Sequence, residues 1–360
     1  MFNNVFKNKN VLVTGHTGFK GSWLCLWLVD LGANVYGISD QTHGVDSHWL
    51  GLNLDISEDF YDIADFDKLN NSIQTFKPDI ILHLAAQSLV RRSYREPYQT
   101  LKSNVVGTMN VLESIRLADK AVACLVVTSD KCYDNKEWLW GYREIDSLGG
   151  NDVYSASKAM CEILTHSYRE SFFKDRGTQT GLIATARAGN VIGGGDWSED
   201  RLVPDIVRSV LNKENLVIRS PSATRPWQHV LDCLQGYLIL GSELLLGNTI
   251  SVGAWNFGPD ISSNKSVKNL VSALDKNGLG AHLVFKNDDA MPEAHNLYLD
   301  SSKARKHLRW EPIWDFSETV KMTASWYNCY LDEELVISSG QLEKYINDAK
   351  VIGADFANYD

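Results

Sequence analysis

The sequence predicts an α/β protein built on a parallel β-sheet with helices packed on both of its faces. Short apolar runs alternate with longer amphipathic segments over the first half of the chain. The expected strands are Asn10–Thr14, Asn34–Ile38, Ile80–Ala85, Cys124–Ser129 and Gly181–Arg187. The expected helices are Gly18–Leu31, Phe66–Phe76, Gln99–Ala118 and Val153–Phe173. Strand–helix units of this length, repeated along a chain, are typical of a doubly wound parallel sheet.

The alternation ends after about residue 189, where glycine, proline and tryptophan cluster in "GNVIGGGDW" and "SPSATRPWQH". A helix-rich segment follows. We therefore expect residues 1–190 and about 228–262 to form the sheet-bearing domain. Residues from about 191–227 and 263–330 would form a smaller C-terminal α/β domain for substrate, leaning over the C-terminal edge of the sheet. For the tail, residues 331–360, the sequence predicts no function.

The composition restricts the possible partners. The 360-residue chain has 44% hydrophobic and 22% charged residues, as soluble globular proteins do. A net charge of −10 without a basic run argues against a nucleic acid or an anionic membrane as partner. The N-terminal sequence does not resemble a signal peptide, and the most apolar run, Ser22–Val29, is too short to span a bilayer. The six cysteines follow no metal-ligand spacing, so we expect buried free thiols, no metal site and a cytoplasmic location.

The first expected strand runs into the glycine-rich turn "TGHTGFKGS" and then into a helix. Gly15, Gly18 and Gly21 follow the pattern GxxGxxG, which lets the backbone approach a pyrophosphate at the helix N-terminus. A purely structural turn is the alternative. The position between a strand and a helix favours a dinucleotide site and a Rossmann-type sheet. The other cofactor-side residues of this turn are His16, which would line or shape it, Thr17 and Phe19.

The acids after the next strands indicate which dinucleotide binds. Asp40 ends the second expected strand, about twenty residues beyond the glycines, where an acid would bind a ribose 2′-hydroxyl. A 2′-phosphate would require Arg or Lys, and neither occurs between Lys20 and Lys68, so NAD is favoured over NADP. Asp62 and Ile63 are placed to contact the adenine, although Asp62 could instead cap a helix or be a solvated acid.

Three further residues predict catalysis of proton and hydride transfer. Tyr154 and Lys158 are four residues apart and therefore share one helical face, and Ser129 ends the strand before that helix. A phenol of pKa near 10 becomes a base near neutral pH only with roughly 4 kcal/mol of differential stabilisation. The Lys158 ammonium and an oxidised nicotinamide ring could supply it. Ser129 would hold the substrate oxygen in line.

This trio resembles the active site of the short-chain dehydrogenase/reductase superfamily, and the GxxGxxG turn with "HLAAQ" at 83–87 is similar to its extended branch. The resemblance implies that Leu84, Ala85, Ala86 and Asn104 contact the cofactor, as do Tyr154 and Lys158. Within this branch Asp130 and Lys131 distinguish dehydratases from epimerases, because expelling a hydroxyl requires a general acid. The runs "TSDKCYDNKEWLWGYRE", "RAGNVIGGGDW", "DRLVPDI", "RPWQHVL", "WNFGP" and "EAHNLYLDSSKA" resemble CDP-glucose 4,6-dehydratases.

The resemblance covers nearly the whole chain, with departures at "QTHGVDSHW" after Asp40, at Arg92, and at Val153 and Ala156 beside the tyrosine. None of these departures removes a catalytic group.

The resemblance implies a hydro-lyase of deoxysugar (O-antigen type) biosynthesis that converts CDP-D-glucose to CDP-4-keto-6-deoxy-D-glucose and water, with NAD as cofactor. Tyr154 would take the C4 hydroxyl proton, and Asp130 would protonate the departing C6 oxygen. Lys131 would either remove the C5 proton or only orient the site, because neighbouring charges act on its protonation in both directions.

The resemblance also implies contacts to the sugar nucleotide. The candidates are Arg91, Tyr94, Asn190, Arg201, Leu202, Arg225, Glu293, His295 and Tyr298. Arg201 and Arg225 are the candidate diphosphate ligands, since a guanidinium matches two phosphate oxygens. Glu293 would accept a hydrogen bond from the cytosine amino group, whereas His295 could equally be a surface histidine. Trp138 and Trp140 would form a lid or a packing strip.

Three hypotheses remain open on the sequence alone: a CDP-glucose dehydratase, a nucleotide-hexose 4-epimerase or a dehydratase for another nucleotide sugar, and a regulator that binds a dinucleotide without catalysis. The resemblance further implies a homodimer, or a dimer of dimers, through the segments 99–118 and 153–173.

Overall fold

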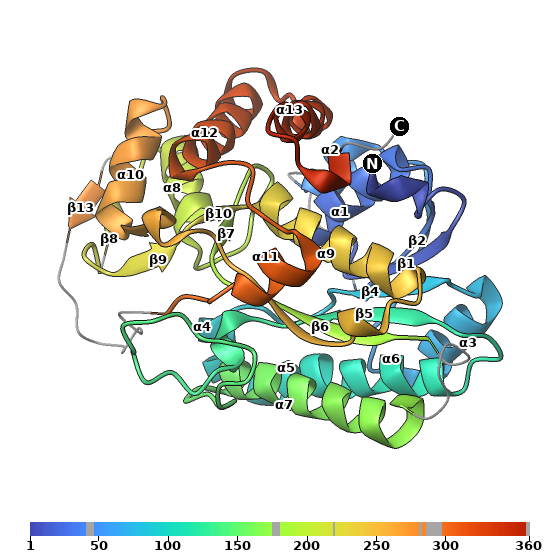
Figure 1. The fold of residues 1–360 in the computed structure, drawn as a ribbon. Helices are drawn as coiled ribbons and strands as arrows, with labels where there is room; N and C mark the ends of the chain where they lie inside the picture. Colours follow the sequence, from blue (N-terminus) through green and yellow to red (C-terminus); the bar gives the residue numbers. More distant parts are fainter. Residues whose placement is uncertain (41–46, 175–180, 219, 281–282, 286–296, 358–360) are drawn as a thin grey trace.

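The structure is a computed structural model and describes residues 1–40, 47–174, 181–218, 220–280, 283–285 and 297–357. Its centre is a seven-stranded sheet of order β11-β6-β5-β4-β1-β2-β3, with every neighbouring pair parallel (Figure 1). The strands are β1 (Asn10–Thr14), β2 (Asn34–Ser39), β3 (Ser57–Phe60), β4 (Ile80–His83), β5 (Ala123–Val127), β6 (Ile183–Ala188) and β11 (Gly253–Phe257). The strand order reverses between β1 and β4, which confirms the predicted Rossmann-type doubly wound sheet.

Helices cover both faces of the sheet (Figure 1). One face carries α3 (Phe66–Phe76), α5 (Pro97–Leu101), α6 (Gly107–Arg116) and α7 (Val153–Tyr168). The other carries α1 (Phe19–Asp30) and α9 (Val230–Leu245), with α13 (Ser338–Val351) packed on the outer side of α1. Successive residues of a strand point to opposite faces. Val11 and Val13 therefore pack into the core with α1 and α9, whereas Leu12 packs into the core with α3 and α6.

Chain segments beyond residue 189 form small sheets and helices beside the C-terminal ends of the strands, at the left and top of Figure 1. Three two-stranded sheets pair β7 (Val191–Ile192) with β10 (Gln228–His229), β9 (Thr224–Pro226) with β12 (Asn264–Ser266), and β8 (Leu216–Ile218) with β13 (Leu283–Phe285). The remaining helices are α2 (His48–Leu52), α4 (Val90–Arg95), α8 (Leu202–Asn212), α10 (Val267–Lys276), α11 (Ser302–Leu308) and α12 (Phe316–Glu333).

The elements follow the predictions apart from small shifts at several ends, a π-helical turn Arg169–Phe173 at the end of the expected helix 153–173, and three further differences. First, β4 and β5 end two residues earlier than expected, so that the residues carrying the expected chemistry lie beyond the sheet. Second, a π-helical turn, Lys102–Val106, interrupts the expected helix 99–118. Its Asn104 is buried and bonds to the loop after β4, and such turns are frequent at functional sites. Third, β3 and β11 were not expected. All four residues of β3 are exposed, so this edge strand has no apolar pattern.

The segment after residue 330, for which no role was predicted, completes the core through α13. Tyr345 and Ala349 of this helix are fully buried, and the Tyr345 ring packs edge-on against Trp27 of α1, with ring centroids 5.7 Å apart. All six cysteines are free thiols. Within the described ranges, no helix has both the length and the apolar character needed to cross a membrane.

Candidate active site

The glycine turn lies where β1 and β4 separate. Gly15 has a φ of +75°, and a Cβ atom there would lie 2.8 Å from the backbone of Ala85. A Cβ on Gly21 would lie 2.0 Å from the carbonyl oxygen of Gly15. Gly18 precedes α1, whose first residue is Phe19, and has no side chain to cover the first N–H groups of the helix. The turn therefore offers a bare backbone cradle and a positive helix end, the features that a dinucleotide pyrophosphate requires.

The buried side chain of His16 connects this turn to β2 and β3. Its ring is fully buried, with Nε2 2.8 Å from Glu58 Oε2 and Nδ1 3.1 Å from Ser39 Oγ. Thr17 donates to the same Ser39 hydroxyl from its backbone N–H and from its hydroxyl, at 3.3 and 3.1 Å. A Cβ on Gly37 would lie 2.5 Å from the His16 ring. These contacts support the interpretation that His16 shapes the turn.

The acids expected beside the adenosine half lie at the ends of β2 and β3. Asp40 is exposed directly after β2. Asp62 accepts hydrogen bonds from Lys102 Nζ at 2.8 Å and from the Ala64 N–H at 2.9 Å. Burial tends to raise the pKa of Asp62, but these two donors lower it below its ordinary value. The Ile63 side chain is buried against α6 in the core below this edge.

Asn104 holds the loop that carries the expected cofactor contacts Leu84, Ala85 and Ala86. Its side-chain oxygen accepts from the Gln87 N–H at 2.8 Å, and its amide donates to the Gln87 carbonyl at 3.0 Å and to Ser157 Oγ at 2.8 Å. Ser157 belongs to the same helix as Tyr154 and Lys158. Asn104 therefore links the loop after β4 to the catalytic helix.

Ser129, Asp130 and Tyr154 meet at the C-terminal end of β5. Ser129 Oγ donates to Asp130 Oδ1 at 3.0 Å and is also hydrogen-bonded to the Tyr154 hydroxyl. All three residues are buried, with exposed fractions of 7%, 3% and 6%. Burial raises the pKa of Tyr154 to about 12, with the Asp130 carboxylate adding to the rise, while the bond to Ser129 and the charge of Arg201 oppose it. A cation bound next to this phenol would lower its pKa from this raised value toward neutrality.

The lysines of the site have different surroundings. Lys158 is buried one helical turn after Tyr154, and its Nζ donates to the carbonyl oxygen of Val127 at 3.2 Å. Burial lowers the pKa of Lys158, and the ammonium of Lys20 lowers it further. Lys131 is half-buried, and its ammonium forms no ion pair within the described part of the chain.

Two segments that carry expected sugar-nucleotide residues border Asp130. A Cβ on Gly189 would lie 3.0 Å from Asp130 Oδ2 and 3.6 Å from Pro226, so the segments that carry Asn190 and Arg225 border the carboxyl group. Leu202 begins α8, directly after Arg201.

Two arginines bridge the same region. The Arg201 guanidinium donates to Asp196 at 3.1 Å and to Ser88 Oγ at 3.1 Å. Arg91 pairs with Asp200 at 3.1 Å from α4, the helix that also carries the exposed Tyr94. The structure thus places the loop before α8 against the segment after β4.

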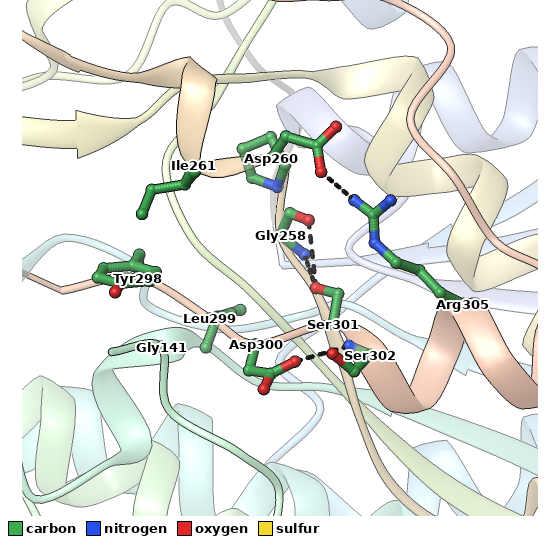
Figure 2. Close-up of a pocket in the computed structure, with 11 residues that line it drawn as sticks. Gly141, Gly258, Asp260, Ile261, Tyr298, Leu299, Asp300, Ser301, Ser302 and Arg305 are labelled. Carbon is green, nitrogen blue, oxygen red and sulfur yellow. Dashed lines mark hydrogen bonds and ion pairs between the residues drawn. The ribbon is translucent and has the colours of Figure 1, made fainter. Parts of the chain in front are cut away.

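Tyr298 lines a separate cavity of about 270 Å³, between the end of β11 and the start of α11 (Figure 2). An ion pair of 2.6 Å between Arg305 and Asp260 lies on its wall, and the Tyr298 hydroxyl donates to the Leu139 carbonyl. The lining of this cavity contains none of Ser129, Asp130 or Tyr154.

Two of the predicted residues, Glu293 and His295, lie outside the described residues.

Trp138 stacks on Tyr142, with ring centroids 5.5 Å apart and an interplanar angle of 11°, and also contacts Trp140.

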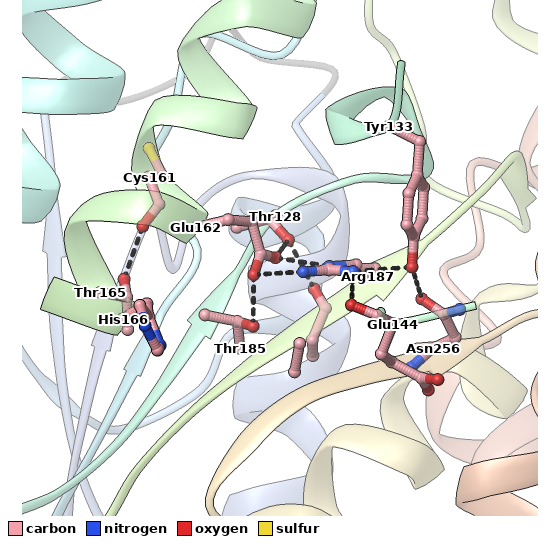
Figure 3. A network of polar contacts seen from close by, with 12 residues as sticks. Thr128, Tyr133, Glu144, Cys161, Glu162, Thr165, His166, Thr185, Arg187 and Asn256 are labelled. Atoms are coloured by element: carbon pink, nitrogen blue, oxygen red, sulfur yellow. Dashed lines mark hydrogen bonds and ion pairs between the residues drawn. The ribbon is translucent and has the colours of Figure 1, made fainter. Parts of the chain in front are cut away.

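Two polar pairs, of which only the second is fully buried, were not expected from the sequence. Lys20 donates to the Tyr237 hydroxyl at 3.2 Å, across 217 residues of chain. Arg187 and Glu162 form an ion pair (Figure 3). The sequence did indicate that Arg187 has a buried acidic partner, because a charge inside the apolar strand "IATARA" requires one. Nothing in the sequence indicated which acid it would be.

Comparisons with known proteins agree with this geometry. Residues 12–323 match the model of the family described as GDP-mannose 4,6 dehydratase. The chain is 43% identical to a CDP-glucose 4,6-dehydratase of Salmonella typhimurium, over 96% of this chain and 98% of that protein. It is 27% identical to a dTDP-glucose 4,6-dehydratase of Xanthomonas campestris, with coverages of 88% and 92%.

Solved structures show the same fold. A dTDP-glucose 4,6-dehydratase of Bacillus anthracis in complex with NAD superposes with a TM-score of 0.75 at 19% identity, covering 91% of this chain and 98% of that one. DesIV, a dTDP-glucose 4,6-dehydratase of Streptomyces venezuelae, superposes with a TM-score of 0.74 at 23% identity, with coverages of 89% and 97%. From the family match and the 43% identity, this chain belongs to the GDP-mannose 4,6 dehydratase family of nucleotide-sugar dehydratases.

Proposed function

We propose that this chain is a CDP-glucose 4,6-dehydratase, which converts CDP-D-glucose to CDP-4-keto-6-deoxy-D-glucose and water with NAD as its resident cofactor. The observation that carries the proposal is the buried contact of Ser129 with both Tyr154 and Asp130 at the end of β5. A 4-epimerase needs the phenol and the hydroxyl, whereas a carboxyl group beside them is needed to expel a hydroxyl as water. The 43% identity to the Salmonella enzyme supports CDP as the nucleotide.

The described residues fit NAD. Gly15, Gly18 and Gly21 form the pyrophosphate cradle, and Asp40 at the end of β2 would accept the ribose hydroxyls. Asp62 and the Ile63 backbone would flank the adenine. When bound, NAD supplies a hydride acceptor for the first step and a hydride donor for the last.

Different side chains of the cluster carry out the different proton transfers. Tyr154 takes the proton of the C4 hydroxyl while Ser129 holds that oxygen, and Lys158 supports the phenolate from the same helical face. Oxidation at C4 gives a ketone, which acidifies the C5–H bond. Asp130 then gives its proton to the C6 oxygen, which leaves as water as the C5 proton is removed. Lys131, next on the same turn, is assigned to that removal. Reduction at C6 and protonation at C5 complete the product.

The remaining predicted residues are assigned to the nucleotide. Arg201 and Arg225 would bind the diphosphate, whose negative charge matches two guanidinium groups. Asn190 and Leu202 would contact the sugar and diphosphate from the same side, and Arg91 and Tyr94 from α4. Tyr298, Glu293 and His295 would face the cytidine.

The proposal includes a homodimer in the cytoplasm. Apolar side chains are exposed on α6 and α7: Met109 at 39%, Met160 at 45% and Ile163 at 57%, together with Leu117, directly after α6, at 45%. Exposed apolar patches of this kind mark protein interfaces. Six free thiols suit a reducing compartment.

The proposed function is tested by measuring which nucleotide sugar the protein converts. The purified protein is incubated with NAD and, in parallel, with CDP-glucose, dTDP-glucose, UDP-glucose or GDP-mannose. Mass spectrometry and the alkali-induced absorbance of keto sugars follow the product. We expect loss of one water from CDP-glucose. Turnover of another nucleotide sugar without turnover of CDP-glucose would refute the nucleotide assignment. A product of unchanged mass and inverted C4 would identify an epimerase.

A further inference from the structure

The buried ion pair behind the catalytic cluster has no part in the proton transfers above. Arg187, near the end of β6, donates from Nε to Glu162 Oε1 at 2.9 Å and from Nη2 to Glu162 Oε2 at 2.8 Å (Figure 3). Each side chain is 3% exposed. Burying two charges costs free energy that their attraction only partly returns, so such a pair is weak evidence for stability. Its presence therefore suggests a role in fixing geometry.

Several neighbouring polar groups bond to the pair. Thr128 and Thr185 donate their hydroxyls to the two oxygens of Glu162. Arg187 Nη1 donates to the Tyr133 hydroxyl at 2.7 Å, which in turn donates to Asn256 Oδ1 at 2.8 Å. Burial tends to raise the pKa of Glu162, but the hydrogen bonds and charge of Arg187 lower it, so the pair stays ionised. A fully bonded buried network holds its members in one arrangement.

The partners of the pair occupy both ends of the catalytic turn. Thr128 directly precedes Ser129, and Tyr133 directly follows the short helical turn Asp130–Cys132. Glu162 lies four residues after Lys158, one turn further along α7. Through Arg187 and Glu162, the ends of the segment that carries Ser129, Asp130 and Lys131 are therefore joined to the helix that carries Tyr154 and Lys158.

We propose that Arg187 and Glu162 are positioning residues, whose ion pair sets the separation between the Ser129–Asp130–Lys131 turn and the Tyr154–Lys158 face of α7. The inference rests on the dehydratase function proposed above. That reaction needs a base at C4 and an acid at C6 of one hexose, contributed by two different elements of the chain. Errors of about 1 Å between such groups cost about a hundredfold in rate.

The charge of Glu162 also affects the pKa of Lys158. The Glu162 carboxylate raises the pKa of Lys158, against the larger effect of burial. Removing Arg187 alone leaves that carboxylate unpaired, and removing Glu162 alone leaves a guanidinium. The two single changes are therefore expected to move the pH dependence of turnover in opposite directions.

The test compares Glu162→Gln, Arg187→Lys, Arg187→Met and the double variant Glu162→Met/Arg187→Met. The double variant removes both charges and keeps similar volume, a change that buried pairs often tolerate without loss of stability. The control is Glu318→Gln/Lys321→Met, which removes a partly exposed ion pair on α12 and the contact of Glu318 with Lys344. Thermal unfolding, NAD binding, kcat, KM and the pH profile with CDP-glucose are measured for each.

We expect the folded double variant to lose about 10- to 100-fold in kcat, with KM and NAD affinity within about twofold of wild type. Arg187→Lys should recover only part of the loss, because lysine keeps the charge but not the two-pronged contact. A folded double variant with wild-type kcat and pH profile would overturn the proposal. If wild type turns over a different nucleotide sugar, the CDP assignment fails and the same variants are compared on that substrate. If wild type dehydrates no nucleotide sugar, both proposals fail.

Discussion

Gly15 and Ala85 meet where the sheet reverses its strand order: a Cβ atom on Gly15 would lie 2.8 Å from both Cα and N of Ala85. The two residues follow β1 and β4, the strands between which the chain order changes. In sheets of this kind, ligands bind at that crevice, outside the carboxyl ends of the strands. The contact therefore sets how closely the glycine turn can approach the loop that is expected to contact the cofactor.

Gly15→Ala is predicted to destabilise the fold by about 2–5 kcal/mol, because the positive φ and the overlap with Ala85 add together. NAD affinity should fall more than tenfold. Gly353→Ala is the matched control: its φ is +74°, but no atom lies within 4 Å of the added Cβ, so only the backbone strain remains. Denaturant unfolding and NAD titration measure both variants. Equal effects on NAD affinity would show that the contact with Ala85 is irrelevant to the cofactor.

Asp130→Asn should abolish loss of water while oxidation at C4 continues, because the amide cannot give a proton to the C6 oxygen and Tyr154 is unchanged. Rapid mixing with CDP-glucose should then show reduced nicotinamide accumulating, with no sugar of lower mass. Tyr154→Phe provides the contrast, since it should stop the reaction before any reduced nicotinamide forms. If Asp130→Asn suppresses both signals to the same degree as Tyr154→Phe, Asp130 is not the acid of the elimination.

Arg201→Gln should move the acid limb of the kcat/KM profile to higher pH. The Arg201 charge lowers the pKa of Tyr154, which burial raises to about 12 overall, so losing the cation raises it further. A rise of one pKa unit leaves about tenfold less phenolate at a given pH. Arg91→Gln is the control, because its side chain is also 34% exposed, whereas Arg201 is the cation whose charge lowers the pKa of Tyr154. An Arg201→Gln profile that coincides with that of Arg91→Gln contradicts the prediction.

Some elements could be predicted because local signals coincide. Helix α3 has the expected bounds, since Asp65 caps its first turn through the Lys68 N–H and Lys77 ends it in a left-handed conformation. Strand β3 has no such signal: its four residues are exposed at the sheet edge, and pairing with β2 alone makes it a strand. The π turn around Asn104 likewise depends on partners distant in sequence, Gln87 and Ser157.

The active site likewise contains residues that local sequence patterns predict and residues that they do not. Ser129, Asp130 and Tyr154 were found because their spacing places them on a strand end and the following helix. Glu162 was not, although it lies on the same helix, because its partner Arg187 belongs to another strand. Lys20 and Tyr237 come together only through the packing of α1 on α9. Pairing of buried charges is decided by tertiary structure, which a local pattern does not contain.

Ile163→Glu should convert a dimer to a monomer, because it would place a carboxylate in the proposed α6–α7 interface. The side chain is 57% exposed, so the monomer fold should be unaffected. Ile352→Glu, at a site 60% exposed just after α13, is the matched control. Sedimentation velocity reports the mass of both variants. An Ile163→Glu protein with the same mass as wild type and control would place the interface elsewhere.

Asp232→Asn should remove a pH dependence of stability. Asp232 is fully buried on α9, and burial raises its pKa to about 7 against the bonds from the Ile313 N–H and the Tyr345 hydroxyl. The unfolded carboxyl has a pKa of about 3.9, so between about pH 4 and 7 the folded state keeps a proton that the unfolded state has lost. Its contribution to the free energy of unfolding therefore falls as pH rises through this window, by up to about 1.4 kcal/mol per pH unit, and is gone above it.

Urea unfolding at about pH 5, 6, 7 and 8 measures this slope for wild type and Asp232→Asn. Asn stays neutral throughout, so the variant should lose less stability than wild type on going from acid to neutral pH. Asp332→Asn, an exposed residue near the end of α12, should keep the wild-type slope. Parallel curves for wild type and Asp232→Asn would mean that the buried carboxyl is ionised throughout this range, and that its neighbours on α13 and at Ile313 hold the charge.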